Sequence, residues 1–246
     1  EIRLKKRWSV KKKAAISLLV VFFVVFSFLF AKVEKTFSLI NNRFWRRAIH
    51  IDNYYEKNRT DILLMGLRGK DDVENGGLLT DTVMLISIDT ENDKMALISI
   101  PRDLYVRIPG LDKMEKLNSA YAYGKGKDGD GLSASRQAVE KATGINIDYA
   151  AAVDFDAFIG LIDIIGGIDV YVSREFTETS QWGWEFRVPK GMNHMNSQTA
   201  LYYARSRYST SDFDRSRRQQ DILMAIADKA FSLKILSSPV KLNAIL

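Results

Sequence analysis

The fold is decided between residues 61 and 100, where three apolar runs stand close together: DILLMGL at 61–67, TVMLISID at 82–89 and KMALISI at 94–100. A short apolar run bounded by turn residues is typical of a buried strand. The tetrapeptide TEND between the second and third runs has the length of a hairpin turn. Pro101 ends the third run, because proline has no N–H to donate to a strand ladder. The sequence therefore predicts a strand, a glycine-rich loop and then a β-hairpin.

After Pro101 the spacing of apolar residues indicates helices interrupted by strands. We expect helices at 115–124, 132–143, 157–165, 197–204 and 213–236, and strands at 149–154 and 168–172. We interpret the GKGKDGDG segment as a flexible connection, because it lacks the Gly-Lys-Ser/Thr ending of a P-loop and the final glutamate of an EF-hand. The strand-helix-strand order around 157–165 predicts that its two strands pair in parallel. The predicted fold class is α/β, a single α/β/α domain with a mixed central sheet flanked by helices.

An uncharged apolar segment, AAISLLVVFFVVFSFLFA at 14–31, precedes this domain. At a rise of ~1.5 Å per residue a helix of this length measures about 27 Å, close to the hydrocarbon thickness of a bilayer. Residues 1–13 contain seven basic side chains and Glu1, a net charge of 7 − 1 = +6, which equals the +6 of the whole chain. Because positive flanks stay cytoplasmic, we expect an uncleaved signal anchor with the N-terminus inside. The prediction is a cytoplasmic tail at 1–13, a transmembrane helix at 14–31, a stalk at 32–60 and an extracytoplasmic domain at 61–246, held at the cell membrane by a single pass.

Composition excludes several classes of function. The chain has no cysteine, which excludes disulfides, thiol catalysis and cysteine zinc sites, and its two histidines make a histidine metal cage a poor expectation. No GxSxG motif is present, so the sequence does not support a hydrolase triad. A nucleic-acid partner is not expected either, because the domain is neutral overall and is predicted to face away from the cytoplasm.

The strongest chemical signal is YARSRYSTSDFDRSRRQQ at 203–220, with five arginines and two aspartates between Arg205 and Arg218. If Ser211 or Asp212 caps the last helix, Arg215, Arg218 and Gln219 lie on one face of it. Arginines in a first helical turn oppose the helix dipole, so a bound anion is expected to offset them. Phosphate suits them best, because the guanidinium fork matches its oxygens. A solvated basic face, or internal pairing of arginine with aspartate, is the alternative interpretation.

Two further positions indicate a site at a sheet edge. Arg102 and Asp103 follow a predicted strand directly, and ligands of open α/β sheets bind beyond the carboxyl ends of strands. Asp81 opens the 82–89 strand beside the glycine-rich loop, where its carboxylate is placed to bind a hard cation such as Mg²⁺. The alternative for each residue is an ordinary surface position at a strand end.

Five stretches together resemble the LytR-CpsA-Psr family of cell-wall glycopolymer ligases, from residue 61 to about 236. They are Thr80-Asp81-Thr82, Ser99-Ile-Pro-Arg-Asp103, Lys116-Leu-Asn-Ser-Ala-Tyr121, Asp163-Ile-Ile-Gly-Gly-Ile168 and Ala200 to Gln220. The resemblance implies a phosphotransferase that moves a glycan from a polyprenyl diphosphate carrier to peptidoglycan through a phosphodiester. The implied partners are the lipid-linked glycan, peptidoglycan and the lipid bilayer.

The resemblance also implies roles for individual residues. It assigns diphosphate binding to Arg102, Lys116, Asn118, Arg205, Arg207, Arg215, Arg218 and Gln219. It assigns Mg²⁺, or Mn²⁺ in its place, to Asp81. The catalytic group would comprise Arg102 and a carboxylate, Asp103 or Asp212, that accepts the proton of the acceptor hydroxyl. An apolar slot for the polyprenyl tail would be lined by Phe155, Phe158, Ile159 and Ile162.

The chain departs from the family pattern at two places. Many members carry an aspartate where this chain has Leu67-Arg68, so metal binding is expected to be weaker or to be completed by Asp71 or Asp72. The family's glycine before the helix arginine is Asp214 here, and relatives usually continue beyond the point where this chain ends. Two other functions stay open: a pyrophosphatase that uses water as acceptor, and a non-catalytic binder or regulator that senses lipid-linked precursors.

Overall fold

The computed structural model describes residues 58–69, 77–89, 91–92 and 94–232. The predicted tail and membrane span, the stalk up to residue 57, Asp71 and Asp72, and the last helix beyond residue 232 lie outside this part. Among the described residues, no helix is both long and apolar enough to cross a bilayer.

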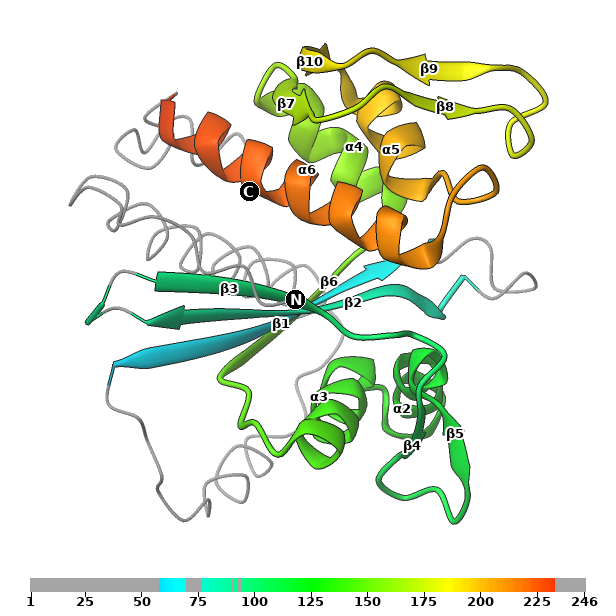
Figure 1. Ribbon diagram of the computed structural model, residues 1–246. Coiled ribbons are helices and arrows are strands. Elements are labelled where there is room, and N and C mark those ends of the chain that lie inside the picture. The colour runs from blue at the N-terminus through cyan, green and yellow to red at the C-terminus, as the bar shows by residue number, and fades with distance from the viewer. Residues whose placement is uncertain (1–57, 70–76, 90, 93, 233–246) are drawn as a thin grey trace.

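A four-stranded mixed sheet forms the centre of the domain (Figure 1). Its strands are β1 (Arg59–Leu67), β2 (Thr80–Asp89), β3 (Lys94–Ser99) and β6 (Tyr149–Val153), in the order β3-β2-β1-β6. The predicted hairpin is confirmed, because β2 pairs antiparallel with β3, and β1 also runs antiparallel to β2. β1 and β6 are parallel, so the sheet is mixed as predicted. The carboxyl ends of β1 and β6 therefore meet at the same edge, where β2 begins.

Alternate residues of β1 serve two different cores, as the pleat of a strand requires. Leu63 and Met65 are fully buried on the face that packs against α2 and α3. Ile62 lies on the opposite face with Ile86 and Ile88, where Leu223 of α6 packs against them. The near-continuous apolar run of β1 thus reflects a strand covered on both faces.

The layer below the sheet in Figure 1 differs from the sequence prediction at its start. It consists of β4 (Tyr105–Arg107), β5 (Met114–Lys116), the 3-10 helix η2 (Leu117–Ser119), α2 (Ala120–Asp128) and α3 (Gly131–Thr143). The predicted helix at 115–124 is wrong at its beginning, because residues 114–116 pair with β4. Most of the GKGKDGDG segment is helical rather than a flexible connection. Its Gly124 lets α2 and α3 approach, since a Cβ there would lie 2.6 Å from the carbonyl oxygen of Asp130.

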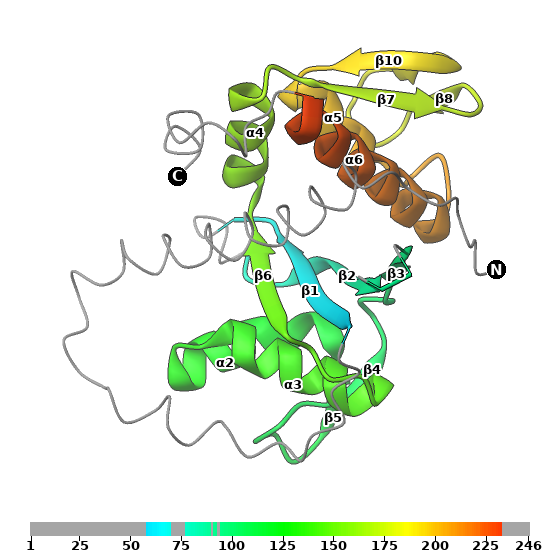
Figure 2. The same ribbon diagram turned by 90° about the vertical axis from the view of Figure 1, so that its left-hand side faces the viewer.

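The upper layer holds the second core, built from helices and two small sheets (Figures 1 and 2). It consists of α4 (Phe155–Ile164), β7 (Ile168–Val172), β8 (Phe176–Glu178), β9 (Phe186–Val188), β10 (Gly191–Met195), α5 (Ser197–Arg205) and α6 (Asp212–Ser232). The predicted parallel pairing of residues 149–154 with 168–172 is wrong. β7 pairs antiparallel with β10 instead, after Gly166 and Gly167 turn the chain with positive φ angles. Helices therefore flank the sheet on both faces, but β7 belongs to the upper layer.

One side chain connects α6 to the edge strand of the central sheet. Gln220 donates hydrogen bonds from its amide nitrogen to Ser99 Oγ at 3.0 Å and to the Leu97 carbonyl at 3.4 Å. Together with the contact of Leu223 on the sheet, this holds the middle of α6 against the central sheet.

Candidate functional site: an arginine cluster at the sheet edge

Asp81 lies where β1 ends and β2 begins, at an irregularity of the strand pairing. Gly66 pairs with Thr82 and Leu67 pairs with Thr80, so Asp81 is the extra residue of a β-bulge. A Cβ at Gly66 would come within 3.1 Å of the Thr82 side chain, so glycine permits the close approach here. Bulges commonly re-aim a side chain beside a functional site. Here the bulge presents the Asp81 carboxylate beyond the sheet edge.

Arg102 follows β3 at the same edge and is fixed by its backbone. Its carbonyl accepts a hydrogen bond from the amide of Asn118 at 3.0 Å, and its Nη1 forms an ion pair with Asp81 Oδ1. Its Nε lies 3.5 Å from Asp103 Oδ2, and 16% of the side chain is exposed. The structure therefore brings together Asp81, Arg102 and Asp103, with the Asn118 backbone as their support.

Asp103 is held by cations on two sides. Lys116 Nζ donates to its Oδ1 at 2.8 Å. This hydrogen bond, aided by the charges of Arg102 and Lys116, outweighs partial burial and lowers the pKa of Asp103. The same pair raises the pKa of Lys116. Lys116 is thus connected to Arg102 and Asp81 by its contact with the Asp103 carboxylate. Because its pKa is lowered, Asp103 stays ionised to lower pH than an ordinary aspartate.

Three arginines of the 203–220 segment surround this edge from the upper layer. Arg205 ends α5, Arg207 lies in the following loop and Arg215 is in the first turn of α6. The pKa of Arg205 is lowered by burial and then by the charge of Arg68, while Asp81 opposes both effects. Figure 1 shows the start of α6 above the edge where β2 begins. Arg68, at one of the positions where the chain departs from the family pattern, thus belongs to the same group.

Arg215 is the most deeply placed member of this cluster, with 7% of the residue exposed. Burial lowers its pKa, Asp212 opposes that shift, and the charges of Arg102 and Arg207 add to it. Its Nη2 donates to Asp212 Oδ2 at 3.2 Å, but its buried Nε has no hydrogen-bond partner in the described part of the chain. A buried cation with an unsatisfied donor beside like charges is costly unless an anion completes it.

The start of α6 is organised by a capping box. Ser211 Oγ accepts from the amide of Asp214 at 3.1 Å, and Asp214 Oδ2 accepts from the Ser211 amide at 3.3 Å and from its hydroxyl at 2.8 Å. Of the two residues considered as the cap, Ser211 or Asp212, Ser211 is the one that caps the helix, and Asp214 is the reciprocal third residue of the box. Asp212 and Asp214 also place negative charge in the first turn, which offsets the unfavourable position of Arg215 at a helix N-terminus.

Arg218 and Gln219 both donate hydrogen bonds to backbone carbonyls near the end of α5. Arg218 is 5% exposed, and its guanidinium donates to the carbonyls of Tyr203 and Ser206 and to Thr210 Oγ1. Gln219 donates from its amide nitrogen to the Ala204 carbonyl at 3.2 Å. Both side chains therefore hold the end of α5 and the loop after it. Through these contacts they support the segment that carries Arg205 and Arg207, and their role in binding a diphosphate stays a prediction.

The loop between β8 and β9 also holds residues 205–207 by hydrogen bonds, which was not predicted. Gln181 donates to the Arg205 carbonyl at 3.1 Å and accepts from the Arg207 amide at 2.8 Å. Trp182 Nε1 donates to Ser206 Oγ at 3.0 Å. Glu178 is fully buried beneath them and accepts four hydrogen bonds, from the amides of residues 180, 181 and 209 and from the Ser209 hydroxyl.

Replacing Glu178 with glutamine is expected to lower the free energy of unfolding by about 1–3 kcal/mol at neutral pH. The amide NH2 group takes the place of one carboxylate oxygen and faces the donors from which that oxygen accepted, and the negative charge is lost. Burial raises the pKa of Glu178, but its hydrogen bonds outweigh this and the net shift is downward. Its contribution is therefore present above the unfolded pKa and is lost as pH falls through the lower folded value. Urea unfolding between about pH 7 and pH 3 should show less acid destabilisation in the variant than in wild type.

Glu175→Gln is the matched control, because that carboxylate is half-exposed and pairs only with Arg187 at the surface among the described contacts. It should change the unfolding free energy by less than about 0.5 kcal/mol. Equal stability profiles for Glu178→Gln and Glu175→Gln would contradict the assigned role.

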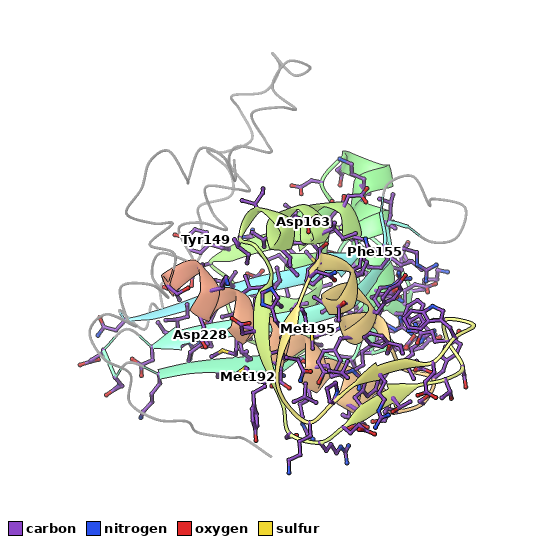
Figure 3. The ribbon with its side chains drawn as sticks, turned by 90° about the horizontal axis from the view of Figure 1, so that it is seen from above. Tyr149, Phe155, Asp163, Met192, Met195 and Asp228 are labelled. Carbon is purple, nitrogen blue, oxygen red and sulfur yellow. The ribbon has the colours of Figure 1, made fainter. Side chains whose placement is uncertain are left out.

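The apolar side chains expected to line a lipid slot all lie on α4. Ile162 is fully buried in the upper core, and Phe158 is half-buried and packs against that core. Phe155 and Ile159 are half-buried. Figure 3 shows Phe155 far from Tyr149, at the end of the sheet that β6 reaches before α4 begins. The Arg205 guanidinium stacks over the Phe155 ring at 4.2 Å, so the cluster directly adjoins the apolar helix.

The model of the LytR_cpsA_psr family matches residues 27–246. A protein of Bacillus mycoides (strain KBAB4) named polyisoprenyl-teichoic acid--peptidoglycan teichoic acid transferase TagU is 35% identical, over 72% of this chain and 54% of its own length. Regulatory protein MsrR of Staphylococcus aureus (strain COL) is 32% identical, over 80% of this chain and 58% of its own. This chain thus spans little more than half of these relatives.

Two solved structures have folds similar to that of this chain. The crystal structure of B. subtilis TagV is 36% identical with a TM-score of 0.57, covering 71% of this chain and 65% of that one. The structure of TagT bound to LI-WTA is 27% identical with a TM-score of 0.59, covering 74% and 67%.

Proposed function

The chain belongs to the LytR-CpsA-Psr family, and we propose that it transfers a glycopolymer from a polyprenyl diphosphate carrier to a sugar hydroxyl of peptidoglycan. The observation that carries the proposal is the convergence of Arg102, Arg205 and Arg215 around Asp81, with Arg207 near Arg215. Within the described ranges, these cations exceed the carboxylates beside them, and the N–H of the buried Arg215 Nε has no acceptor there. A diphosphate supplies the missing anion and accepts from guanidinium forks in a bidentate manner.

In the proposed reaction, the acceptor hydroxyl oxygen bonds to the phosphorus that carries the glycan. The bridging P–O bond to the second phosphorus breaks, and polyprenyl phosphate leaves with the bond's electron pair. The arginines neutralise charge on the phosphoryl oxygens and hold the reacting groups in line, which is most of what phosphoryl transfer requires of a protein. The remaining requirements are that the acceptor and the leaving group are correctly placed and that a base accepts the proton of the acceptor hydroxyl.

We assign that base to Asp212 in preference to Asp103. Lys116 and Arg102 lower the pKa of Asp103, which makes it a weaker proton acceptor. Among the described residues, Asp212 accepts one hydrogen bond, from Arg215, and half of its side chain is exposed at the start of α6. Its other carboxylate oxygen, beside the phosphate-binding arginine, is well placed for the proton of an incoming hydroxyl.

Phe155 and Ile159 are proposed to contact the first isoprene units of the carrier. The stacking of Arg205 on Phe155 means that a phosphate bound at Arg205 places its attached carbon chain next to α4. The cation-rich edge and the apolar helix thus match the two ends of a polyprenyl diphosphate.

The test is to incubate the protein with a radiolabelled polyprenyl-diphosphate glycan and peptidoglycan fragments, and to separate the products. Transfer gives a glycan-peptidoglycan phosphodiester and polyprenyl phosphate. A pyrophosphatase gives free glycan phosphate, because water is then the acceptor. Binding of the labelled substrate without any product would favour a regulator, a reading supported by the relative named as a regulatory protein.

The topology proposed for this function is a single-pass anchor with the domain outside the cytoplasm. Protease added to intact cells, after the wall has been removed enzymatically, should digest the domain formed by residues 61–232. Peptide-specific antibodies against the domain and against the basic tail would follow the two parts separately. A domain protected until the membrane is opened would reverse the assigned orientation.

A further inference from the structure

The hairpin of β4 and β5 presents exposed side chains on one of its faces. This outward face consists of two cross-strand pairs, Tyr105 with Lys116 and Arg107 with Met114, and all four residues are exposed. Cross-strand partners share a face of a sheet, so these side chains form one surface. Val106 points to the other face and is buried in the lower core. The hairpin is thus anchored on one face and offers an aromatic ring, a thioether and two cations on the other.

The outward face of the hairpin continues into the arginine cluster. Lys116 Nζ donates to Asp103 Oδ1 at 2.8 Å, and Asp103 Oδ2 lies 3.5 Å from Arg102 Nε. The backbone pairing extends in the same direction, because the amide of Asn118 donates to the Arg102 carbonyl at 3.0 Å. Contacts of both backbone and side chains therefore hold Tyr105 at a fixed place beside Arg102. Its ring is 60% exposed and is ready to meet a ligand that reaches beyond the cluster.

The hairpin and the apolar helix α4 lie at opposite ends of the sheet edge. In the strand order β3-β2-β1-β6, β3 leads into Arg102 and the hairpin, whereas β6 leads into Phe155 and α4. β3 and β6 run in the same direction, so both end at this edge with two strands between them. Figure 1 shows β4 and β5 below the sheet and α4 above it. A ligand that lies along the edge therefore meets α4 at one end and the hairpin at the other.

The proposed reaction needs its acceptor at the end away from the lipid. Phosphoryl transfer places the attacking and leaving oxygens roughly in line, on opposite sides of the phosphorus. The stacking of Arg205 over Phe155 assigns the leaving polyprenyl phosphate to the α4 end. The acceptor hydroxyl then approaches from the β3 end. Asp212, the assigned base, serves this end, because it pairs with Arg215 and the charge of Arg102 acts on Arg215.

We propose that the outward face of the hairpin is the subsite for the acceptor glycan, and that the Tyr105 ring stacks against a sugar ring of peptidoglycan. The C–H bonds of a pyranose carry partial positive charge and pack on the electron-rich face of an aromatic ring. Arg107, on the same face, complements the carboxylates that peptidoglycan carries on its lactyl groups and peptide stems. A strand bound here places the hydroxyl of a neighbouring sugar at the arginine cluster. This inference rests on the proposed function, since it concerns the acceptor of the same reaction.

The experiment measures transfer from a labelled polyprenyl-diphosphate glycan to a soluble peptidoglycan tetrasaccharide with its peptide stems, using the full chain in detergent micelles. Tyr105→Ala should raise the KM for the tetrasaccharide roughly five- to thirtyfold and leave kcat and the donor KM within about twofold of wild type. Tyr105→Phe should recover most of this loss, because it keeps the ring. Tyr171→Ala is the matched control, since that tyrosine is also 60% exposed on a strand but belongs to β7 in the upper layer. Its acceptor KM should equal that of wild type.

Calorimetry with geranyl diphosphate shows whether the variant is folded with an intact donor site, and Tyr105→Ala should bind this probe as wild type does. An unchanged acceptor KM in Tyr105→Ala overturns the inference and leaves the proposed function standing. A raised donor KM with an unchanged acceptor KM overturns it too, because the ring would then contact the glycan of the donor. Wild type that releases glycan phosphate to water and forms no phosphodiester overturns the proposed function, and the acceptor subsite falls with it.

Discussion

Arg218→Ala is expected to lower the free energy of unfolding by about 3 kcal/mol, the largest effect on stability of any single arginine in the cluster segment. The substitution leaves the buried carbonyls of Tyr203 and Ser206 without their charged donor. It also removes the packing of the guanidinium over the Phe176 ring, 4.3 Å away. Urea unfolding monitored by tryptophan fluorescence would measure the loss.

Arg217→Ala is the matched control for this effect. Arg217 is the sequence neighbour of Arg218 and carries the same charge, but it is exposed on another face of α6. Its replacement should change stability by less than about 0.5 kcal/mol. Arg218→Lys should remain destabilised, because the ammonium group is not a planar fork that reaches three acceptors. Equal stabilities of the Arg217 and Arg218 variants would show that the carbonyl contacts contribute nothing.

The central sheet was predictable because its signals are local. The strands at 61–67, 82–89 and 94–100 are apolar runs with turn residues between them, and each occurs in the structure with shifts of one or two residues. The partner of the 168–172 strand was not predictable in this way. β10 ends 23 residues after β7 ends and has a weak apolar pattern, so nothing local distinguishes that pairing from one with β6. The hairpin of β8 and β9 was missed because three-residue strands are too short for alternation to show.

The site was predictable to the extent that it depends on a strand end or a helix cap. Arg102, Asp81 and Arg215 were identified from such positions, and the structure gathers them at one edge. Arg218 was grouped with Arg215 because i, i+3 spacing places them on one face, but spacing does not reveal which side chain meets a neighbouring loop. Glu178 resembles any surface glutamate in sequence. Three of its four donors are backbone amides, which carry no signature of their own.

Arg102→Ala is expected to weaken the binding of a polyprenyl diphosphate roughly ten- to hundredfold, because one charge-assisted guanidinium contact contributes about 1.5–3 kcal/mol. Contacts within the protein hold both the backbone and the guanidinium of Arg102. Asn118 fixes its backbone and Asp81 fixes its guanidinium, so its donors are preorganised before a ligand arrives. Replacing Arg102 by alanine therefore removes donors that are already held in place, as well as a positive charge.

The comparison of Arg102→Ala with Arg102→Lys separates those two contributions. Lysine keeps the charge but loses the fork, so Arg102→Lys should bind more tightly than Arg102→Ala and still fall short of wild type. Arg102 pairs with the partly exposed carboxylates of Asp81 and Asp103, whereas Arg218 donates to buried backbone carbonyls. Both Arg102 variants should therefore unfold within about 1 kcal/mol of wild type, unlike Arg218→Ala. Calorimetry with geranyl diphosphate, beside urea unfolding of the same samples, would test both statements. An Arg102→Lys variant with full affinity would mean that the site recognises charge alone, and an Arg102→Ala variant with full affinity would move the diphosphate away from this edge.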